Sequence, residues 1–254
     1  MNLLQGILLG VIQGITEWLP VSSSGHLAIT QKFFGLGAPI MFDLLVHIAT
    51  LIVILGVFSK DIIAILRAIV KWDIKSKEFK WGLYIILANI PVLLVGYFFR
   101  TYAEAIFTNM IFIGIAFLFT GTLLFFSNWR KITAKVGIFN SIIIGISQAL
   151  ALFPGISRSG STISTATLQG VSREDAVRFS FLIAIPAFVG AILLNIGNVT
   201  AELISTPYIA GFLTALVVGY FSLKLLINLV IKKQKFHYFA YYCWALGILV
   251  LILA

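Results

Sequence analysis

The sequence predicts an all-α polytopic membrane protein, built as an inverted repeat of six transmembrane helices and two re-entrant helical hairpins. Three observations predict it. The 254 residues are 60% hydrophobic and only 11% charged. Six long apolar segments are separated by basic gaps, and two further apolar segments are interrupted by proline, glycine and serine. We expect a single membrane domain over residues 1–254, with repeat halves at 1–130 and 131–254.

The composition excludes an ordinary soluble domain. Such domains are about 45–50% apolar and about 25% charged, so lipid must solvate most of this chain. The net charge is +9, but the basic residues fall between apolar runs. That distribution is typical of membrane topology, so we expect membrane lipids around the chain and no nucleic-acid partner.

Six apolar segments are long enough to cross a membrane. A hydrocarbon core about 30 Å thick needs about 20 apolar helical residues. The six segments are residues 41–59, 82–99, 106–126, 177–197, 208–231 and 237–254.

Two other apolar segments, residues 1–34 and 137–170, are broken in the middle. Pro20 and Pro154 stop the first helical piece of each, because proline has no N–H and clashes with the preceding turn. The serines that follow are typical caps of a second helix. Each piece is too short to cross comfortably, so we predict re-entrant hairpins. Two ordinary kinked spans are the alternative.

The basic residues predict the orientation. Fourteen of the 18 Lys and Arg residues lie in four gaps, and they fall on one face if the interrupted segments are re-entrant. The positive-inside rule makes that face cytoplasmic, with both termini and the opening of the site on the extracytoplasmic side. The charge bias supports re-entrance of the second segment and says little about the first. The fourteen are Lys60, Arg67, Lys71, Lys75, Lys77, Lys80, Arg130, Lys131, Lys135, Arg173, Arg178, Lys232, Lys233 and Lys235.

The two interrupted segments resemble each other. Residues 10–13 match residues 145–148, and residues 22–25 match residues 157–160, both at an offset of 135. Each copy is followed by three predicted spans, so the second copy enters from the opposite side. In such inverted repeats, broken helices meet near the membrane midplane and their N-termini build a polar site.

Three ionisable residues lie at the predicted breaks: Glu17, His26 and Arg158. Charged groups at membrane depth cost about 2.5–3.5 kcal/mol on insertion scales, so their presence indicates a function. Gln13 shares a helix face with Glu17 at a spacing of four residues. Ser23 and His26 become i, i+3 neighbours if the helix resumes near Ser23.

This set of groups suits a phosphate ester or anhydride. Helix N-termini attract anions, and the planar fork of Arg158 can bind phosphate oxygens in pairs. We expect Glu17, Ser23, His26 and Arg158 to be catalytic. A divalent cation, Mg²⁺ or else Ca²⁺, would be held by Glu17 and Gln13, since magnesium commonly uses one or two carboxylates plus substrate phosphates. The expected phosphate-binding hydroxyls are those of Ser22, Ser24, Ser157, Ser159 and Thr162.

Structural roles remain alternatives for these residues. The serines after Pro20 can serve only as a helix cap, Glu17 can merely pair with Arg158, and His26 can be a structural hydrogen-bonding group. Asp43 and His47 share a helix face near the outer end of the first span. They support the site from behind at most, and interfacial solvation explains them equally well.

Two longer motifs resemble those of a known family. Residues 13–26 (QGITEWLPVSSSGH) and residues 154–162 (PGISRSGST) resemble the two signatures of the undecaprenyl-diphosphate phosphatase (bacitracin-resistance protein) family. The patterns Phe42-Asp43 with His47, and residues 170–173 leading to residues 179–182, are similar to flanking family patterns. The resemblance covers nearly the whole chain.

The resemblance implies a plasma-membrane enzyme of bacterial type that hydrolyses the diphosphate of a polyprenyl lipid carrier. That acid-anhydride hydrolysis recycles the carrier for cell-wall synthesis, and overproduction gives bacitracin resistance. The family's catalytic positions correspond to Glu17, Ser23, His26, Ser157, Arg158 and Thr162. Gln13 departs from the pattern, because the family often has glutamate there, and this puts a two-carboxylate metal site in doubt.

Several points stay open at the level of sequence. In-line attack on the terminal phosphorus can come from Ser23 or from water, with His26 as the base in either case. A lipid-carrier flippase or transporter sharing the inverted-repeat fold is an alternative function, and an intramembrane serine protease is another. The oligomeric state is open, with a homodimer as one option.

Overall fold

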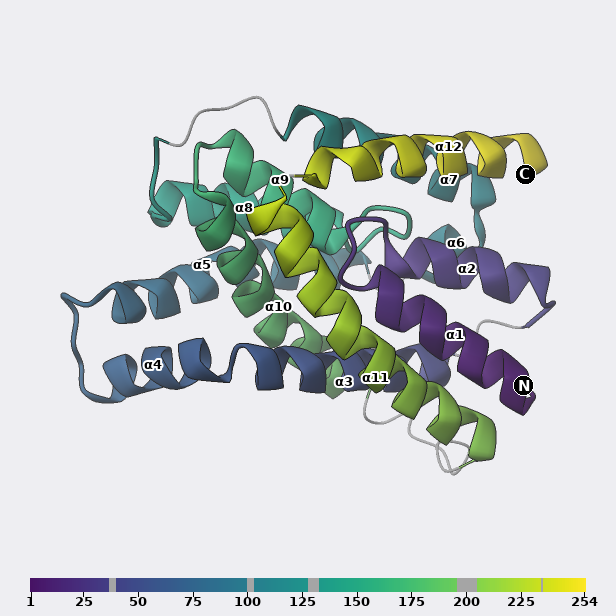
Figure 1. Cartoon of the computed structure of the whole chain (residues 1–254), viewed down its shortest axis with the longest axis horizontal. Helices are drawn as coiled ribbons and strands as arrows, with labels where there is room; N and C mark the ends of the chain where they lie inside the picture. The colour runs from purple at the N-terminus through teal and green to yellow at the C-terminus, as the bar shows by residue number, and fades with distance from the viewer. Residues whose placement is uncertain (37–39, 100–102, 128–132, 196–204, 234) are drawn as a thin grey trace.

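The protein is helical throughout the part of the chain that the computed structural model describes, residues 1–36, 40–99, 103–127, 133–195, 205–233 and 235–254 (Figure 1). The only β-type pairing among these residues is an isolated bridge between Ala134 and Val171. The helices are α1 (Leu3–Thr16), α2 (Ser23–Phe33), α3 (Ile40–Val57), α4 (Ser59–Val70), α5 (Lys77–Phe99), α6 (Ala103–Thr108), α7 (Met110–Phe126), α8 (Ile138–Leu150), α9 (Arg158–Leu168), α10 (Arg173–Asn195), α11 (Thr206–Ile227) and α12 (Phe239–Leu253). A π-helical turn, Asn228–Lys232, extends α11, and a 3-10 turn, Phe236–Tyr238, precedes α12.

Within the described ranges, four helices are long and apolar enough to cross a membrane: α5, α10, α11 with its π-helical extension, and α12 with the turn before it. The pair α3 and α4 makes a fifth candidate, bent by 73°. The predicted span 106–126 begins later than expected, because the Asn109 side chain accepts a hydrogen bond from Phe112 N (3.0 Å) and caps a new helix at Met110. Helix α7 and the first helix of each interrupted segment, α1 and α8, are shorter apolar helices.

Both interrupted segments break where the prolines predict. Helix α1 ends at Thr16 and α8 ends at Leu150, each four residues before a proline. Those are the carbonyls that the missing proline N–H would have served. The predicted serine caps are confirmed: Ser22 Oγ accepts from Gly25 N (3.3 Å) at the start of α2, and Ser157 Oγ accepts from Gly160 N (3.1 Å) at the start of α9.

Each interrupted segment packs against a long helix from the other predicted half. Helix α1 packs on α11, and α8 packs on α5. A Cβ on Gly10 would lie 2.4 Å from the Gly211 carbonyl oxygen, and one on Gly145 would lie 2.3 Å from that of Ala88. Small residues that let helix backbones touch are typical of membrane interfaces. These contacts fix α1 against α11 and α8 against α5.

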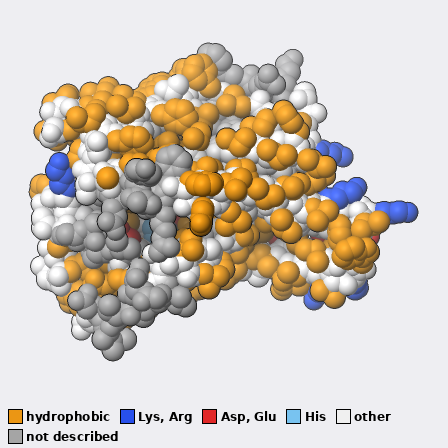
Figure 2. Space-filling view, turned by 180° about the vertical axis from the view of Figure 1, so that it is seen from behind, with side chains coloured by type: hydrophobic (Ala, Val, Ile, Leu, Met, Phe, Trp, Pro, Cys, Tyr) orange, Lys and Arg blue, Asp and Glu red, His pale blue; other side chains and the backbone are white. Residues whose placement is uncertain are grey.

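Basic side chains gather at one end of the molecule. Figure 2 shows a largely hydrophobic face, with most of the visible Lys and Arg at the end where α4 and α5 meet. Lys77 Nζ bonds Asp175 Oδ1 there (3.0 Å), and Arg178 pairs with Asp61 (3.6 Å). The two chain termini lie at the opposite end (Figure 1). Arg100, Arg130 and Lys131 lie outside the described residues.

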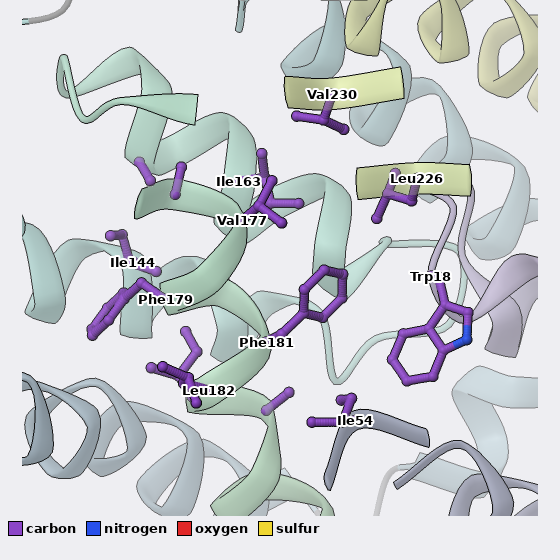
Figure 3. Close-up of a cluster of buried hydrophobic side chains, with 14 of the residues drawn as sticks. Trp18, Ile54, Ile144, Ile163, Val177, Phe179, Phe181, Leu182, Leu226 and Val230 are labelled. Carbon is purple, nitrogen blue, oxygen red and sulfur yellow. The ribbon is translucent and has the colours of Figure 1, made fainter. Parts of the chain in front are cut away.

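The largest hydrophobic cluster lies beneath the breaks (Figure 3). The Trp18 ring is fully buried and meets Phe181 of α10 edge to face, with ring centroids 5.7 Å apart. Since Trp18 follows Glu17 directly, this packing fixes the position of the first break against α10.

Candidate active site

The two breaks meet, and hydrogen bonds join them. Gly155 N donates to Ser22 Oγ (3.1 Å), and Ser159 Oγ donates to the Trp18 carbonyl oxygen (3.0 Å). Thr120 of α7 donates to the Gly155 carbonyl oxygen (3.0 Å) and accepts from Ser157 N (3.2 Å). Segments separated by more than 130 residues therefore form one polar junction among apolar helices.

Glu17 is the centre of this junction. It is only 6% exposed. Its Oε1 accepts from Arg158 Nη2 (2.8 Å), while its Oε2 accepts from Ser23 Oγ (2.6 Å) and Gln13 Nε2 (3.1 Å). A buried carboxylate requires such partners, because an unpaired charge in an apolar environment is strongly unfavourable.

Arg158 has donors left over after it binds Glu17. Its Nε and Nη1 are buried and have no hydrogen-bond partner within the described residues. The guanidinium carbon lies 5.0 Å from the Phe188 ring centroid and 5.7 Å from that of Phe181. A guanidinium that is held against aromatic rings and has two unpartnered nitrogens is suited to bind phosphate oxygens.

His47 lies closer to the centre of the junction than the sequence indicated. Its Nε2 is 3.6 Å from Glu17 Oε2. Its Nδ1 donates to the Asp43 carbonyl oxygen (2.6 Å), and the Asp43 carboxylate accepts from Gln31 (2.8 Å). The sequence signalled this network through the spacing of Asp43 and His47 on one helix face and through the similarity of Phe42-Asp43 with His47 to a flanking family pattern. Its contact with Glu17 depends on how α3 packs against the first break.

The His26 ring contacts Tyr242 rather than the Ser23 hydroxyl. Its Nδ1 donates to the Ser22 carbonyl oxygen (2.7 Å), which leaves Nε2 to accept from the Tyr242 hydroxyl (2.7 Å). The two rings also stack, with centroids 5.7 Å apart. Helix α2 does begin at Ser23, but no hydrogen bond joins Ser23 to His26 within the described residues; the Ser23 hydroxyl donates to Glu17 instead. No pattern in the sequence pointed to Tyr242.

The other expected hydroxyls lie around the junction and bond mainly to the protein. Ser22 and Ser24 are paired (3.3 Å), as are Ser157 and Ser159 (3.4 Å). Thr162 donates to the Arg158 carbonyl oxygen (2.8 Å) and also pairs with Ser180. In this arrangement these groups shape the two breaks, and Ser24 is the only one of the five that is more than slightly exposed.

Gln13 and Glu17 offer oxygen ligands to a cation. Gln13 Oε1 is buried without a hydrogen-bond partner among the described residues, beside the Glu17 carboxylate. The described part of the chain holds no group of three or more His, Cys, Asp and Glu side chains arranged as a metal site. Because magnesium often completes its coordination with water and substrate phosphates, the pair fits a cation shared with a phosphate ligand.

Comparison with known proteins identifies the family. The sequence model of the bacitracin resistance protein BacA family matches residues 6–249. An undecaprenyl-diphosphatase of Carboxydothermus hydrogenoformans is 39% identical, with 100% of this chain and 98% of the relative covered. Undecaprenyl-diphosphatases of Bacteroides thetaiotaomicron (40% identical, 99% of both chains) and Korarchaeum cryptofilum (35% identical, 100% of both chains) are similar over the same extent. The chain therefore belongs to the bacitracin resistance protein BacA family.

Proposed function

We propose that this protein is a membrane hydrolase that converts undecaprenyl diphosphate to undecaprenyl phosphate and inorganic phosphate. Family membership and the names of full-length relatives support this activity. The product is the lipid carrier that cell-wall synthesis uses again. Removal of the diphosphate confers bacitracin resistance, because bacitracin sequesters that form of the carrier.

The structural observation that carries the proposal is the unfilled donor set of Arg158. Two of its N–H groups are buried without a partner among the described residues, at the junction where Glu17 and Ser23 meet. A terminal phosphate placed there accepts a hydrogen bond from an unpaired Arg158 nitrogen and lies beside the Ser23 hydroxyl. Fixed donors of this kind stabilise the charge that develops during phosphoryl transfer.

Two routes follow from this placement. In the serine route, Ser23 Oγ forms a bond to the terminal phosphorus, the bond from phosphorus to the oxygen of undecaprenyl phosphate breaks, and Glu17 Oε2 takes the serine proton across 2.6 Å. Water that gives a proton to His26 then attacks the phosphorus of the phosphoserine, and the bond from phosphorus to Ser23 Oγ breaks. Glu17 returns its proton to Ser23 Oγ, and the proton on His26 leaves with the released phosphate. In the water route, His26 takes a proton from a water that attacks the terminal phosphorus directly, the bond from phosphorus to the oxygen of undecaprenyl phosphate breaks, and the proton on His26 leaves with the phosphate.

His26 is suited to activate water because the hydrogen bond from its Nδ1 to the Ser22 carbonyl oxygen leaves Nε2 as the basic nitrogen. His47 lies beside Glu17 and stabilises its charge in the ionised state. A divalent cation held by Glu17 and Gln13 would supply further neutralisation of the diphosphate charge. Hydroxyls of Ser22, Ser24, Ser157, Ser159 and Thr162 position the two breaks around the phosphate.

The membrane arrangement that we propose has six spans and two re-entrant hairpins, α1–α2 and α8–α9, in halves 1–130 and 131–254. The crossed packing of α1 on α11 and of α8 on α5 supports a repeat of this kind. The ion pair between Lys77 and Asp175 and the hydrogen bond from Ala134 N to the Gly170 carbonyl oxygen (3.1 Å) support one common basic face. That face is cytoplasmic in this proposal, and the termini and site opening are extracytoplasmic.

Phosphate release from undecaprenyl diphosphate by the purified protein in detergent tests the function. We expect multiple turnovers when Mg²⁺ is added. Reactions with and without Mg²⁺ are compared in parallel. A lipid-carrier flippase or transporter requires no turnover without a membrane, and an intramembrane serine protease has no need of Arg158. Absence of phosphate release by folded protein would favour the flippase alternative.

A further inference from the structure

A second polar pocket lies at the basic end of the molecule, outside the site described above. It has a volume of about 360 Å³, within the range of about 300–1,000 Å³ for small-molecule sites. Lys75 lines it from the turn between α4 and α5, and Lys77 and Lys80 line it from the start of α5. Lys135 lines it from the segment before α8, and Asp175 lines it from α10. Four ammonium groups therefore surround one carboxylate.

The positive charge in this pocket is unbalanced. Asp175 is already bound by Lys77 at 3.0 Å. Within the described residues, no carboxylate pairs with Lys75, Lys80 or Lys135. Three ammonium groups around a shared cavity repel one another unless an anion binds between them.

The remaining lining of the pocket is aromatic and apolar. Trp81, which is 7% exposed, Tyr84 and Val136 complete the lining. Beyond Val136, the side chains of Ile138 and Phe139 are 60% and 73% exposed on α8, which packs against the apolar helix α5. A ligand that fills the cavity and extends along this surface must have an anionic head and apolar chains.

We propose that this pocket binds the headgroup of an anionic phospholipid, with the acyl chains lying along α5 and α8. Basic pockets between membrane helices take such headgroups through Coulomb attraction and hydrogen bonds to the phosphate. The exposed apolar side chains next to the pocket favour a lipid over free inorganic phosphate, which has no group to place against them.

The pocket lies where the second interrupted segment enters and leaves the basic face. Lys135 precedes α8, and the adjacent Ala134 N donates to the Gly170 carbonyl oxygen, just after α9 (3.1 Å). Asp175 lies in the first turn of α10. A bound headgroup therefore bridges α5, α10 and the start of the segment that carries Arg158, and it stabilises their packing.

The test is thermal unfolding of the full-length protein in neutral detergent, titrated with dioctanoyl phosphatidylglycerol, dioctanoyl phosphatidylcholine or inorganic phosphate. We expect phosphatidylglycerol to raise Tm and phosphatidylcholine to leave it unchanged. In Lys80→Gln/Lys135→Gln, the half-saturating phosphatidylglycerol concentration rises about fivefold for each lysine removed. Lys80→Arg/Lys135→Arg keeps both cations and retains the effect.

The matched control is Lys71→Gln/Lys233→Gln, which removes the same charge from two exposed positions that do not line the pocket. It should keep the wild-type half-saturation, and equal weakening in this control would show a diffuse charge effect and overturn the proposal. Inorganic phosphate can also bind at Arg158, so its effect is compared between variants. A phosphate-induced rise in Tm that is lost in Lys80→Gln/Lys135→Gln would show a free-anion site and overturn the lipid assignment.

Discussion

Glu17 is the residue on which the site depends, because four side chains converge on its two oxygens. Arg158 holds one oxygen, while Ser23, Gln13 and the ring of His47 approach the other. The carboxylate thus joins the proposed nucleophile to the proposed phosphate clamp. Its burial is tolerated because these partners replace the solvation that it loses.

The dependence of turnover on Mg²⁺ concentration reports the metal role of this residue, whereas its contacts with Ser23 and Arg158 affect turnover at every Mg²⁺ concentration. Glu17→Gln should abolish metal-dependent turnover, because a neutral amide is a weaker ligand for a hard cation than a carboxylate. Gln13→Ala should be milder and partly rescued by magnesium, and Gln13→Glu should tighten magnesium binding. The measurement is turnover against Mg²⁺ concentration for the three variants. An unchanged magnesium curve for Glu17→Gln would remove Glu17 as the metal anchor.

His26 should be needed for proton transfer. His26→Gln should lower kcat by about 10²- to 10⁴-fold, the usual contribution of a general acid–base group. His237→Gln is the control. His237 lies in the 3-10 turn before α12 and, within the described residues, makes no hydrogen bond or ion pair with Glu17, Ser23 or Arg158. Initial rates at saturating substrate provide the comparison. If His47→Gln loses this activity while His26→Gln keeps it, the acid–base role belongs to the histidine beside Glu17.

The site was only partly predictable at this scale. Glu17 and Arg158 were expected to meet because each lies at a break that interrupts an apolar segment. The positions of His47 and Tyr242 relative to the site follow from the packing of α3 and α12, which no local pattern encodes. Hydroxyl partners were also not predictable, because Ser23 is within reach of either Glu17 or His26 until the turn between α1 and α2 is known.

At the scale of elements, the interface between α1 and α11 fixes the first hairpin. Gly10→Ala should lower Tm, since the added Cβ would lie 2.4 Å from the Gly211 backbone oxygen and overpacking costs about 1–3 kcal/mol. Gly190→Ala in α10 is the matched control, because its Cβ would meet nothing within 4 Å. It should leave Tm unchanged or raise it, as alanine favours helix. Equal Tm values for the two variants would show that α1 does not pack tightly against α11.

Helix ends were predictable where proline or a serine cap determines them, as at Thr16, Leu150 and the first turns of α2 and α9. The break at Asn109 was not predicted, because its surroundings are apolar enough to read as one continuous span. The predicted span 41–59 ends at the bend between α3 and α4, but the helix α4 that follows in the basic gap was not predicted. In both places the local geometry decides, and hydropathy alone carries no information about it.

At the scale of the whole molecule, the orientation is a separate prediction. With Cys243 replaced by serine, a cysteine at Lys71 should resist an impermeant thiol reagent in intact cells, since the basic face is placed in the cytoplasm. A cysteine at Ala254 should react. Labelling after membrane permeabilisation controls for accessibility. Reaction at position 71 together with protection at position 254 would reverse the proposed orientation.

The central claim is that the unpartnered N–H donors of the Arg158 guanidinium hold the phosphate that is cleaved. The direct test is the rate of phosphate release from undecaprenyl diphosphate by wild-type protein, Arg158→Lys and Arg178→Lys. Arg178 pairs with acidic side chains at the basic face and controls for the loss of a guanidinium elsewhere. Lysine keeps the charge but not the planar fork, so Arg158→Lys should lower kcat by about 10²-fold or more, while Arg178→Lys stays near wild type. Near-wild-type turnover of folded Arg158→Lys would contradict the account.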